Sequence, residues 1–184
     1  MLSREELIQL AARNVFSGKV LNNAHRGDIV EAMVLAALGD GWRLVGLGWH
    51  PWDLQKGSGD SRVRIQVKQC AALQLWGETK KPSLSFGWKI DAPSYFEHDN
   101  PGEKIEPEGW FCDLFVFGVH RGKDLTTVDQ ADVGQWEFLV IPVTDLKPKT
   151  KSMSLHRALQ RWSLIRWPEL RNSVEAICTT MKAS

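Results

Sequence analysis

The sequence lacks a long apolar run and lacks an excess of either charge. No apolar segment approaches the roughly 18 to 20 residues that a membrane-spanning helix needs, so we expect no membrane-spanning segment. The 184 residues include 23 basic and 22 acidic side chains, which leave a net charge of +1. This balance excludes a protein that binds nucleic acid merely through overall positive charge, although it allows a local basic surface.

The cysteine and glycine patterns exclude further classes. Cys70, Cys112 and Cys178 are widely spaced and form no Cys-x-x-Cys pair, which argues against a disulfide scaffold or a structural zinc site. The segment Gly57-Ser58-Gly59 lacks the lysine and the helix that follow a phosphate-binding loop, so an NTPase is not supported. Because the first residues are acidic where a signal peptide is basic and then apolar, we expect a reduced, cytoplasmic protein.

What remains is an ordinary globular composition, with 43% hydrophobic and 24% charged residues, sized for one domain. Helical spacing, a capping box and apolar runs predict the following elements: helices at Arg4–Val15, about Arg26–Leu38, from a Ser154 cap to about Leu164 and after Pro168, and strands at Trp42–Trp49, Arg62–Cys70, Phe111–His120 and Trp136–Val143. This order predicts an α/β fold with a mixed central β-sheet flanked by helices. We expect a single domain over residues 1–184, with an insertion at about 73–110 and a basic helical part at about 147–184.

One predicted strand carries the residues of greatest chemical interest. In Arg62–Cys70, alternation places Gln66 and Lys68 on the face opposite the apolar residues. Asp53 follows a strand and a turn, and a hairpin of this length returns Gln66 close to it, while Glu31 lies on the preceding helix away from its apolar stripe. Two carboxylates and an amide oxygen near a lysine provide the hard oxygen ligands and the fixed positive charge that Mg²⁺ and a phosphodiester require.

These residues resemble the PD-(D/E)xK, or restriction-endonuclease-like, nuclease superfamily, and within it the Mrr-type branch, whose signature reads Asp…Gln-x-Lys. Pro51-Trp52-Asp53-Leu54 is similar to the Asp motif, and Gln66-Val67-Lys68 is similar to the Gln-x-Lys half. Val30-Glu31-Ala32, followed by Gly41-Trp42-Arg43-Leu44-Val45, is similar to the leading glutamate helix and the first core strand. The likeness covers residues 24–72, and more loosely the segments 112–120 and 137–143.

The resemblance implies a restriction-endonuclease-like core and a Mg²⁺-dependent nuclease, with Mn²⁺ as a substitute, that hydrolyses phosphodiester bonds of nucleic acid, DNA in particular. It implies that Asp53, Gln66, the Val67 carbonyl and Glu31 hold the metal, and that Lys68 assists the attacking water. Gln66 replaces the commoner acid, which removes one negative charge from the site. This departure leaves open a non-catalytic member of the same fold that binds nucleic acid or a protein partner.

Basic residues are concentrated in two regions. From Lys147 to Arg171 the only acid is Glu169, so this part either follows phosphates or forms a solvated face. The insertion mixes bases with aromatic residues, which suits contact with unstacked bases or the packing of a decorated hairpin. The predicted nucleic-acid contacts are Lys80, Lys81, Trp88, Lys147, Lys149, Lys151, Arg157 and Arg161. A homodimer remains open as an alternative to a monomer.

Rival catalytic candidates have simpler explanations. Asp60 lies in the predicted hairpin turn, where aspartate is common for local reasons, and Asp28 suits the start of its helix. Cys112 and His120 suggest a thiol nucleophile, yet both lie in an apolar strand without a third partner. A packed cysteine and a strand-end histidine are the favoured interpretation, with a Cys-dependent hydrolase as the open alternative.

Overall fold

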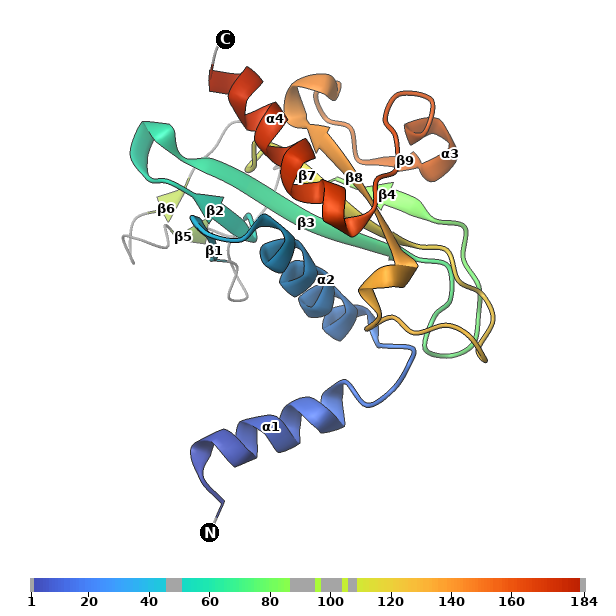
Figure 1. The fold of residues 1–184 in the computed structure, drawn as a ribbon. Helices are drawn as coiled ribbons and strands as arrows, with labels where there is room; N and C mark the ends of the chain where they lie inside the picture. Colours follow the sequence, from blue (N-terminus) through green and yellow to red (C-terminus); the bar gives the residue numbers. More distant parts are fainter. Residues whose placement is uncertain (1, 46–50, 87–94, 97–103, 106–108, 183–184) are drawn as a thin grey trace.

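The computed structural model of this chain describes residues 2–45, 51–86, 95–96, 104–105 and 109–182, and a five-stranded sheet forms its centre (Figure 1). The strand order is β1-β2-β3-β7-β8. Its strands are β1 (Trp42–Leu44), β2 (Leu54–Lys56), β3 (Val63–Ala71), β7 (Leu114–His120) and β8 (Trp136–Pro142). Every neighbouring pair is antiparallel except β3 and β7, which are parallel. The predicted mixed sheet is therefore confirmed.

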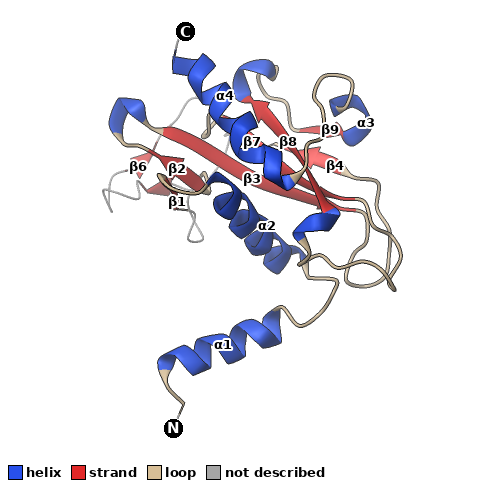
Figure 2. Ribbon diagram, in the orientation of Figure 1, coloured by secondary structure: helices blue, strands red, loops and turns tan. Residues whose placement is uncertain are grey.

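Two helices, α2 (Asn23–Leu38) and α4 (Leu170–Lys182), cover one face of this sheet (Figure 2). Their buried aliphatic side chains form one core cluster with the odd-numbered residues of β3, including Ile65 and Val67. The close approach of α2 depends on Gly118 of β7, where a Cβ atom would lie 2.7 Å from Val30 Cγ1. Alternation along β3 thus decides which face receives the helices.

A second core cluster fills the opposite face. It contains Phe115 and Phe117 of β7 together with residues from the insertion and from the C-terminal part, such as Phe86 and Leu155. A two-stranded sheet joins these parts, because β4 (Ser83–Ser85) pairs with β9 (Ser152–Ser154), and the short helix α3 (Leu155–Ala158) follows. Two more short strands, β5 (Tyr95–Phe96) and β6 (Lys104–Ile105), pair with each other.

The first helix, α1 (Arg4–Val15), has the predicted bounds and the predicted capping box. The Ser3 side chain accepts a bond from the Glu6 N–H, and the Glu6 carboxylate accepts one from the Ser3 N–H. None of its residues is buried, and Figure 1 shows it projecting away from the sheet and its helices. No helix within the described ranges is long and apolar enough to cross a membrane.

Several predicted boundaries differ from the observed ones, among them the start of α2 at Asn23 rather than Arg26, and one strand was not predicted. The helix from the Ser154 cap ends at Ala158, because residue Ile165 pairs through its backbone with Phe138 at the edge of β8 and the chain must become extended to reach it. The first strand ends at Leu44, and residues 46–50 lie outside the described part. The third predicted strand starts at Leu114 rather than Phe111, and β2 (Leu54–Lys56) is the strand that was not predicted.

Candidate active site

Asp53 lies where β2 meets β3, at the point where the edge of β3 loses its strand partner. The Asp53 N–H donates to the Ile65 carbonyl (2.9 Å), and the Val67 N–H donates to Asp53 Oδ2 (2.7 Å). The Asp53 carboxylate therefore accepts the backbone hydrogen bond that the carbonyl of a further strand residue would otherwise accept. Leu54 pairs with Ile65, so Asp53 faces Gln66 in register, as the hairpin argument expected.

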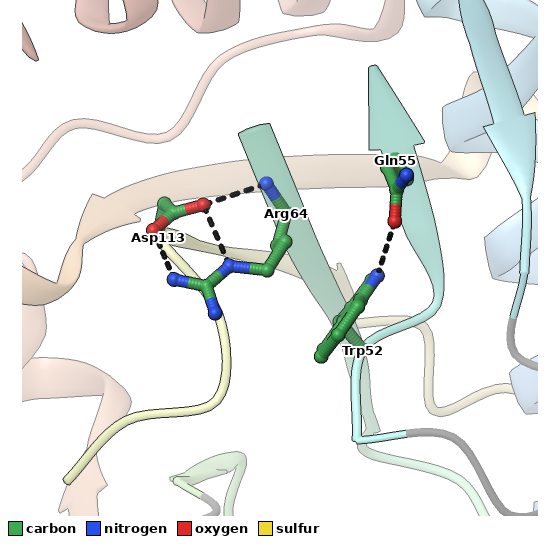
Figure 3. Close-up of polar contacts among 4 residues, drawn as sticks. All are labelled: Trp52, Gln55, Arg64 and Asp113. Carbon is green, nitrogen blue, oxygen red and sulfur yellow. Dashed lines mark hydrogen bonds and ion pairs between the residues drawn. The ribbon is translucent and has the colours of Figure 1, made fainter. Parts of the chain in front are cut away.

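Two polar contacts hold the hairpin strands next to Asp53, one between Arg64 and Asp113 and one between Trp52 and Gln55 (Figure 3). Arg64 donates to both oxygens of Asp113, from Nε to Oδ2 (3.0 Å) and from Nη2 to Oδ1 (2.7 Å), and its backbone N–H also donates to Oδ2 (2.7 Å). Trp52 is fully buried, and its Nε1 donates to Gln55 Oε1 (3.1 Å). Because Trp52 precedes Asp53 directly, these contacts fix the position of the carboxylate.

Glu31 and Lys68 share the electrostatic environment of Asp53. Burial, then the negative charges of Asp53 and Asp28, raise the pKa of Glu31 to about 7, and the positive charge of Lys68 opposes this rise. Burial also raises the pKa of Asp53 to about 6, against the opposing effects of Lys68 and the Val67 N–H. Two carboxylates and one lysine are thus close enough to interact in a partly desolvated place.

A pocket of about 420 Å³ is lined by Glu31 and Lys68 of this group, while Asp53 is not among its lining residues. Glu31 from α2 lines one side, Val67 and Lys68 from β3 form the wall, and Ser85 from β4 lies opposite. Gln69 also lines the pocket, where its amide donates to Asn23 Oδ1 (2.8 Å). The pocket lies between the helix face and the β4–β9 face, where a ligand reaches Glu31 and Lys68 together.

The side chains of Gln66 and Val67 lie on opposite faces of the sheet. Strand alternation puts Gln66 and Lys68 on the face of the second core cluster, and Gln66 is partly buried there. Val67 is buried against α2, but its N–H points along the sheet to Asp53. In a strand, a residue's N–H and carbonyl point to the same side, so the Val67 carbonyl also points toward Asp53.

The side chains around Asp53 offer a hard divalent cation few charged ligands. Within the described ranges, no group of three His, Cys, Asp or Glu side chains is placed to hold a metal ion. The oxygens that the resemblance implies for such an ion are those of the Asp53 and Glu31 carboxylates, the Val67 carbonyl and the Gln66 amide. They suit Mg²⁺ or Mn²⁺, which bind few protein oxygens and keep several waters. A cation here would also relieve the repulsion that raises the pKa of Glu31.

Arg26 is a residue that the sequence reasoning missed. Its side chain is 2% exposed, and it donates to neutral oxygens, including Gln69 Oε1 (2.7 Å), Asn23 Oδ1 (3.0 Å) and the Leu21 carbonyl (3.3 Å). Burial lowers the pKa of this guanidinium. The burial of Arg26 was visible in the sequence, because Arg26 lies four residues before Val30 and therefore falls on the apolar stripe of α2. It places a buried cation at the end of the pocket where Gln69 lies.

The predicted nucleic-acid contacts divide into three groups. Lys80 and Lys81 are exposed before β4, where Lys80 lies over the ring of Trp76 (5.2 Å), and Trp88 lies outside the described residues. Lys149 is exposed with a positive φ of 64°. The remaining four, Lys147, Lys151, Arg157 and Arg161, line one pocket.

The rival candidates gain no support. Cys112 is 2% exposed, and burial raises the pKa of its thiol far above the neutral range, which disfavours a nucleophilic thiolate. His120 is fully buried against Trp136, and burial lowers its pKa. Asp60 is exposed in a 3₁₀ turn, and Asp28 acts on Glu31 only through its charge.

Comparisons with known proteins add one structural likeness. No family model matches the chain, and no curated protein matches it. Among solved structures, a bacterial homing endonuclease, I-Ssp6803I, superposes with a TM-score of 0.44 and 18% sequence identity, over 88% of this chain and 96% of that one. At this level of similarity, a function for this chain has to be argued from its own residues.

Proposed function

We propose that this chain is a metal-dependent nuclease of the PD-(D/E)xK type, with the Asp…Gln-x-Lys signature of the Mrr branch, and that it hydrolyses phosphodiester bonds of DNA. The contact that carries the proposal joins Asp53 Oδ2 to the Val67 N–H at the free edge of β3. It places a carboxylate beside Lys68 and Glu31, next to an open pocket. Buried carboxylates with raised pKa values beside a lysine in a pocket are typical of catalytic sites.

Each residue of the proposed site has a separate role in hydrolysis. Asp53 and Glu31 supply the carboxylate oxygens that would hold Mg²⁺ or Mn²⁺, and the Val67 carbonyl and Gln66 amide supply neutral oxygens. When bound, such an ion polarises a phosphoryl oxygen and lowers the pKa of a coordinated water. Lys68 orients the attacking water and offsets the negative charge that develops on the phosphate. The buried Arg26 adds positive potential at the far end of the pocket.

Cleavage of supercoiled, linear and branched DNA in Mg²⁺, Mn²⁺ or EDTA tests this proposal. We expect cleavage with either ion, none in EDTA, and a loss of at least about a hundredfold in Lys68→Met, because a charge that stabilises the transition state is removed. Lys123→Met serves as the matched control, since Lys123 is exposed outside the site. Parental cleavage by Lys68→Met would remove Lys68 from the chemistry, and cleavage in EDTA would remove the metal.

Gln66 supports a second candidate function, a non-catalytic DNA-binding member of the same fold. With an amide in place of an acid, Asp53 and Glu31 alone supply negative charge to the ion. The same assay separates the two functions. A binder retards DNA in gel-shift experiments at every metal concentration but leaves all three DNA forms intact.

A homodimer is a separate part of the proposal. The helix α1 exposes Leu7, Ile8 and Val15 and buries none of its residues. Sedimentation velocity should show a dimer that Ile8→Lys with Val15→Lys converts to a monomer, and a parental monomer at all concentrations would contradict it.

A further inference from the structure

A second pocket, of about 330 Å³, lies in the C-terminal part and is lined by cations. Its polar lining consists of Lys147, Thr150, Lys151, Ser152, Arg157 and Arg161. No acidic side chain lines it, and its other lining residues are apolar. Four positive charges and the Ser152 hydroxyl group around one hollow offer the donors that a phosphate group requires.

Within the part of the chain that the structure describes, no carboxylate pairs with the cations of this pocket. Across the described residues, Lys147, Lys151 and Arg157 form no ion pair with a carboxylate. Arg161 donates to the Asp145 carbonyl (2.8 Å) and lies over the Trp162 ring (4.4 Å), so its orientation is fixed while its charge remains unpaired. Positive charges held together in this way repel one another, and a bound anion relieves that repulsion.

The loop that carries the pocket is held by backbone contacts. The Thr150 hydroxyl donates to the Lys147 carbonyl (2.6 Å), and the Phe86 N–H donates to the Lys151 carbonyl (2.9 Å). Phe86 belongs to the second core cluster, as does Leu146 at the start of the loop. The pocket is therefore attached to the sheet that carries the candidate active site.

One strand pair connects the two pockets. Ser152 of β9 lines the cationic pocket, and its register partner on β4 is Ser85, which lines the pocket beside Glu31 and Lys68. Cα atoms of antiparallel partners lie only about 4.5 to 5.5 Å apart. Each pocket therefore has one lining residue in the same register position of this strand pair, and we infer that one nucleic-acid backbone contacts both.

We propose that the cationic pocket binds a phosphate of the nucleic acid whose neighbouring phosphodiester lies at Asp53 and Lys68. This inference rests on the proposed function, which identifies the ligand of the pocket as a nucleic acid. The phosphate comes either from within the strand or from its 5′ end, and both sources offer the same anionic oxygens. Its role is to set the distance between the bound phosphate and the bond that is cut.

Equilibrium binding tests the pocket without requiring cleavage. Fluorescence anisotropy measures the affinity of a 20-nucleotide DNA in EDTA, from 50 to 200 mM NaCl, for the parental protein and for Lys151→Gln with Arg157→Gln. Lys19→Gln with Lys123→Gln is the control, because it removes the same two charges from exposed sites outside the pocket. Thermal midpoints show that each variant folds, and either single pocket variant replaces the double one if its midpoint falls.

The pocket variant should bind about tenfold more weakly at 100 mM NaCl and lose about 0.7 to 0.9 from the slope of log K against log salt, as expected for one phosphate contact. A parental slope, or an equal loss in the control variant, would overturn the inference. Tighter binding of 5′-phosphorylated DNA, abolished in the pocket variant, identifies a terminal phosphate as the source, and equal binding of both forms identifies an internal one. If the parental protein does not cleave DNA, that result contradicts the proposed nuclease function and leaves the phosphate-binding pocket to be judged by the binding experiment.

Discussion

Replacing Asp53 by Asn should stabilise the folded protein at high pH and leave its stability unchanged at low pH. Burial is the largest cause that raises the pKa of Asp53 from 3.8 to about 6, and the change already includes the opposing effects of Lys68 and the Val67 N–H. The folded state therefore binds this proton more tightly than the unfolded state does. The stabilising contribution of the protonated carboxyl is complete below about pH 4 and is lost as the pH rises through about 6.

The magnitude follows from the size of the pKa change. At about 1.4 kcal/mol per unit, a rise of about two units costs the ionised protein about 3 kcal/mol above pH 7. Asp53→Asn removes this cost because asparagine is neutral, and its Oδ1 can still accept the bond from the Val67 N–H. A substitution that removes a catalytic group and raises stability is typical of active sites, where function opposes stability.

Urea denaturation in EDTA between pH 4 and pH 8.5 measures the effect, with Asp60→Asn as a matched control on an exposed carboxylate. The gap between Asp53→Asn and the parental protein should open between pH 5 and pH 7. Added Mg²⁺ should narrow it, since a ligand of the folded state stabilises that state. A gap that is independent of pH, or the same gap in Asp60→Asn, would refute the reasoning about a desolvated carboxylate.

Three further substitutions probe the surroundings of the site. Arg26→Met should lower the free energy of unfolding, measured in urea melts, by about 3 kcal/mol or more, because it leaves buried carbonyl and amide oxygens without a donor. A loss below about 1 kcal/mol would contradict the buried network. Gly118→Ala should cost about 1 to 3 kcal/mol, since its Cβ would overlap α2, and a neutral effect would contradict this packing. Gln66→Glu should lower the metal concentration for half-maximal cleavage by adding one charge, and an unchanged midpoint would place Gln66 away from the ion.

Much of the fold can be read from local sequence pattern, because its causes are local. The Ser3–Glu6 box sets the start of α1, and the alternation in β3 gives its two faces and places each of its bounds within one residue. The length of the following hairpin brings Asp53 into register with Gln66. These features depend on residues that are neighbours along the chain, so they are visible without the tertiary structure.

The features that sequence reasoning missed depend on distant contacts. The strand β2 contains Gln55, a fully buried polar residue whose place depends on the Trp52 indole. The helix from the Ser154 cap stops early because Ile165 pairs with the distant Phe138. The basic character of residues 147–161 was visible, but their arrangement around one pocket depends on how the loop before β9, β9 itself and the segment after it fold together.

Single-turnover cleavage of supercoiled DNA in Mg²⁺ by Asp53→Asn and Asp60→Asn tests the central claim most directly. Both variants lose one carboxylate, and only Asp53 lies beside Lys68 and Glu31 at the free edge of β3. We expect Asp53→Asn to cut at least about a hundredfold more slowly than the parental protein, as removal of a metal-holding carboxylate requires, while Asp60→Asn cuts at the parental rate. Cleavage by Asp53→Asn at the parental rate, or its loss in Asp60→Asn, would contradict the placement of the active site.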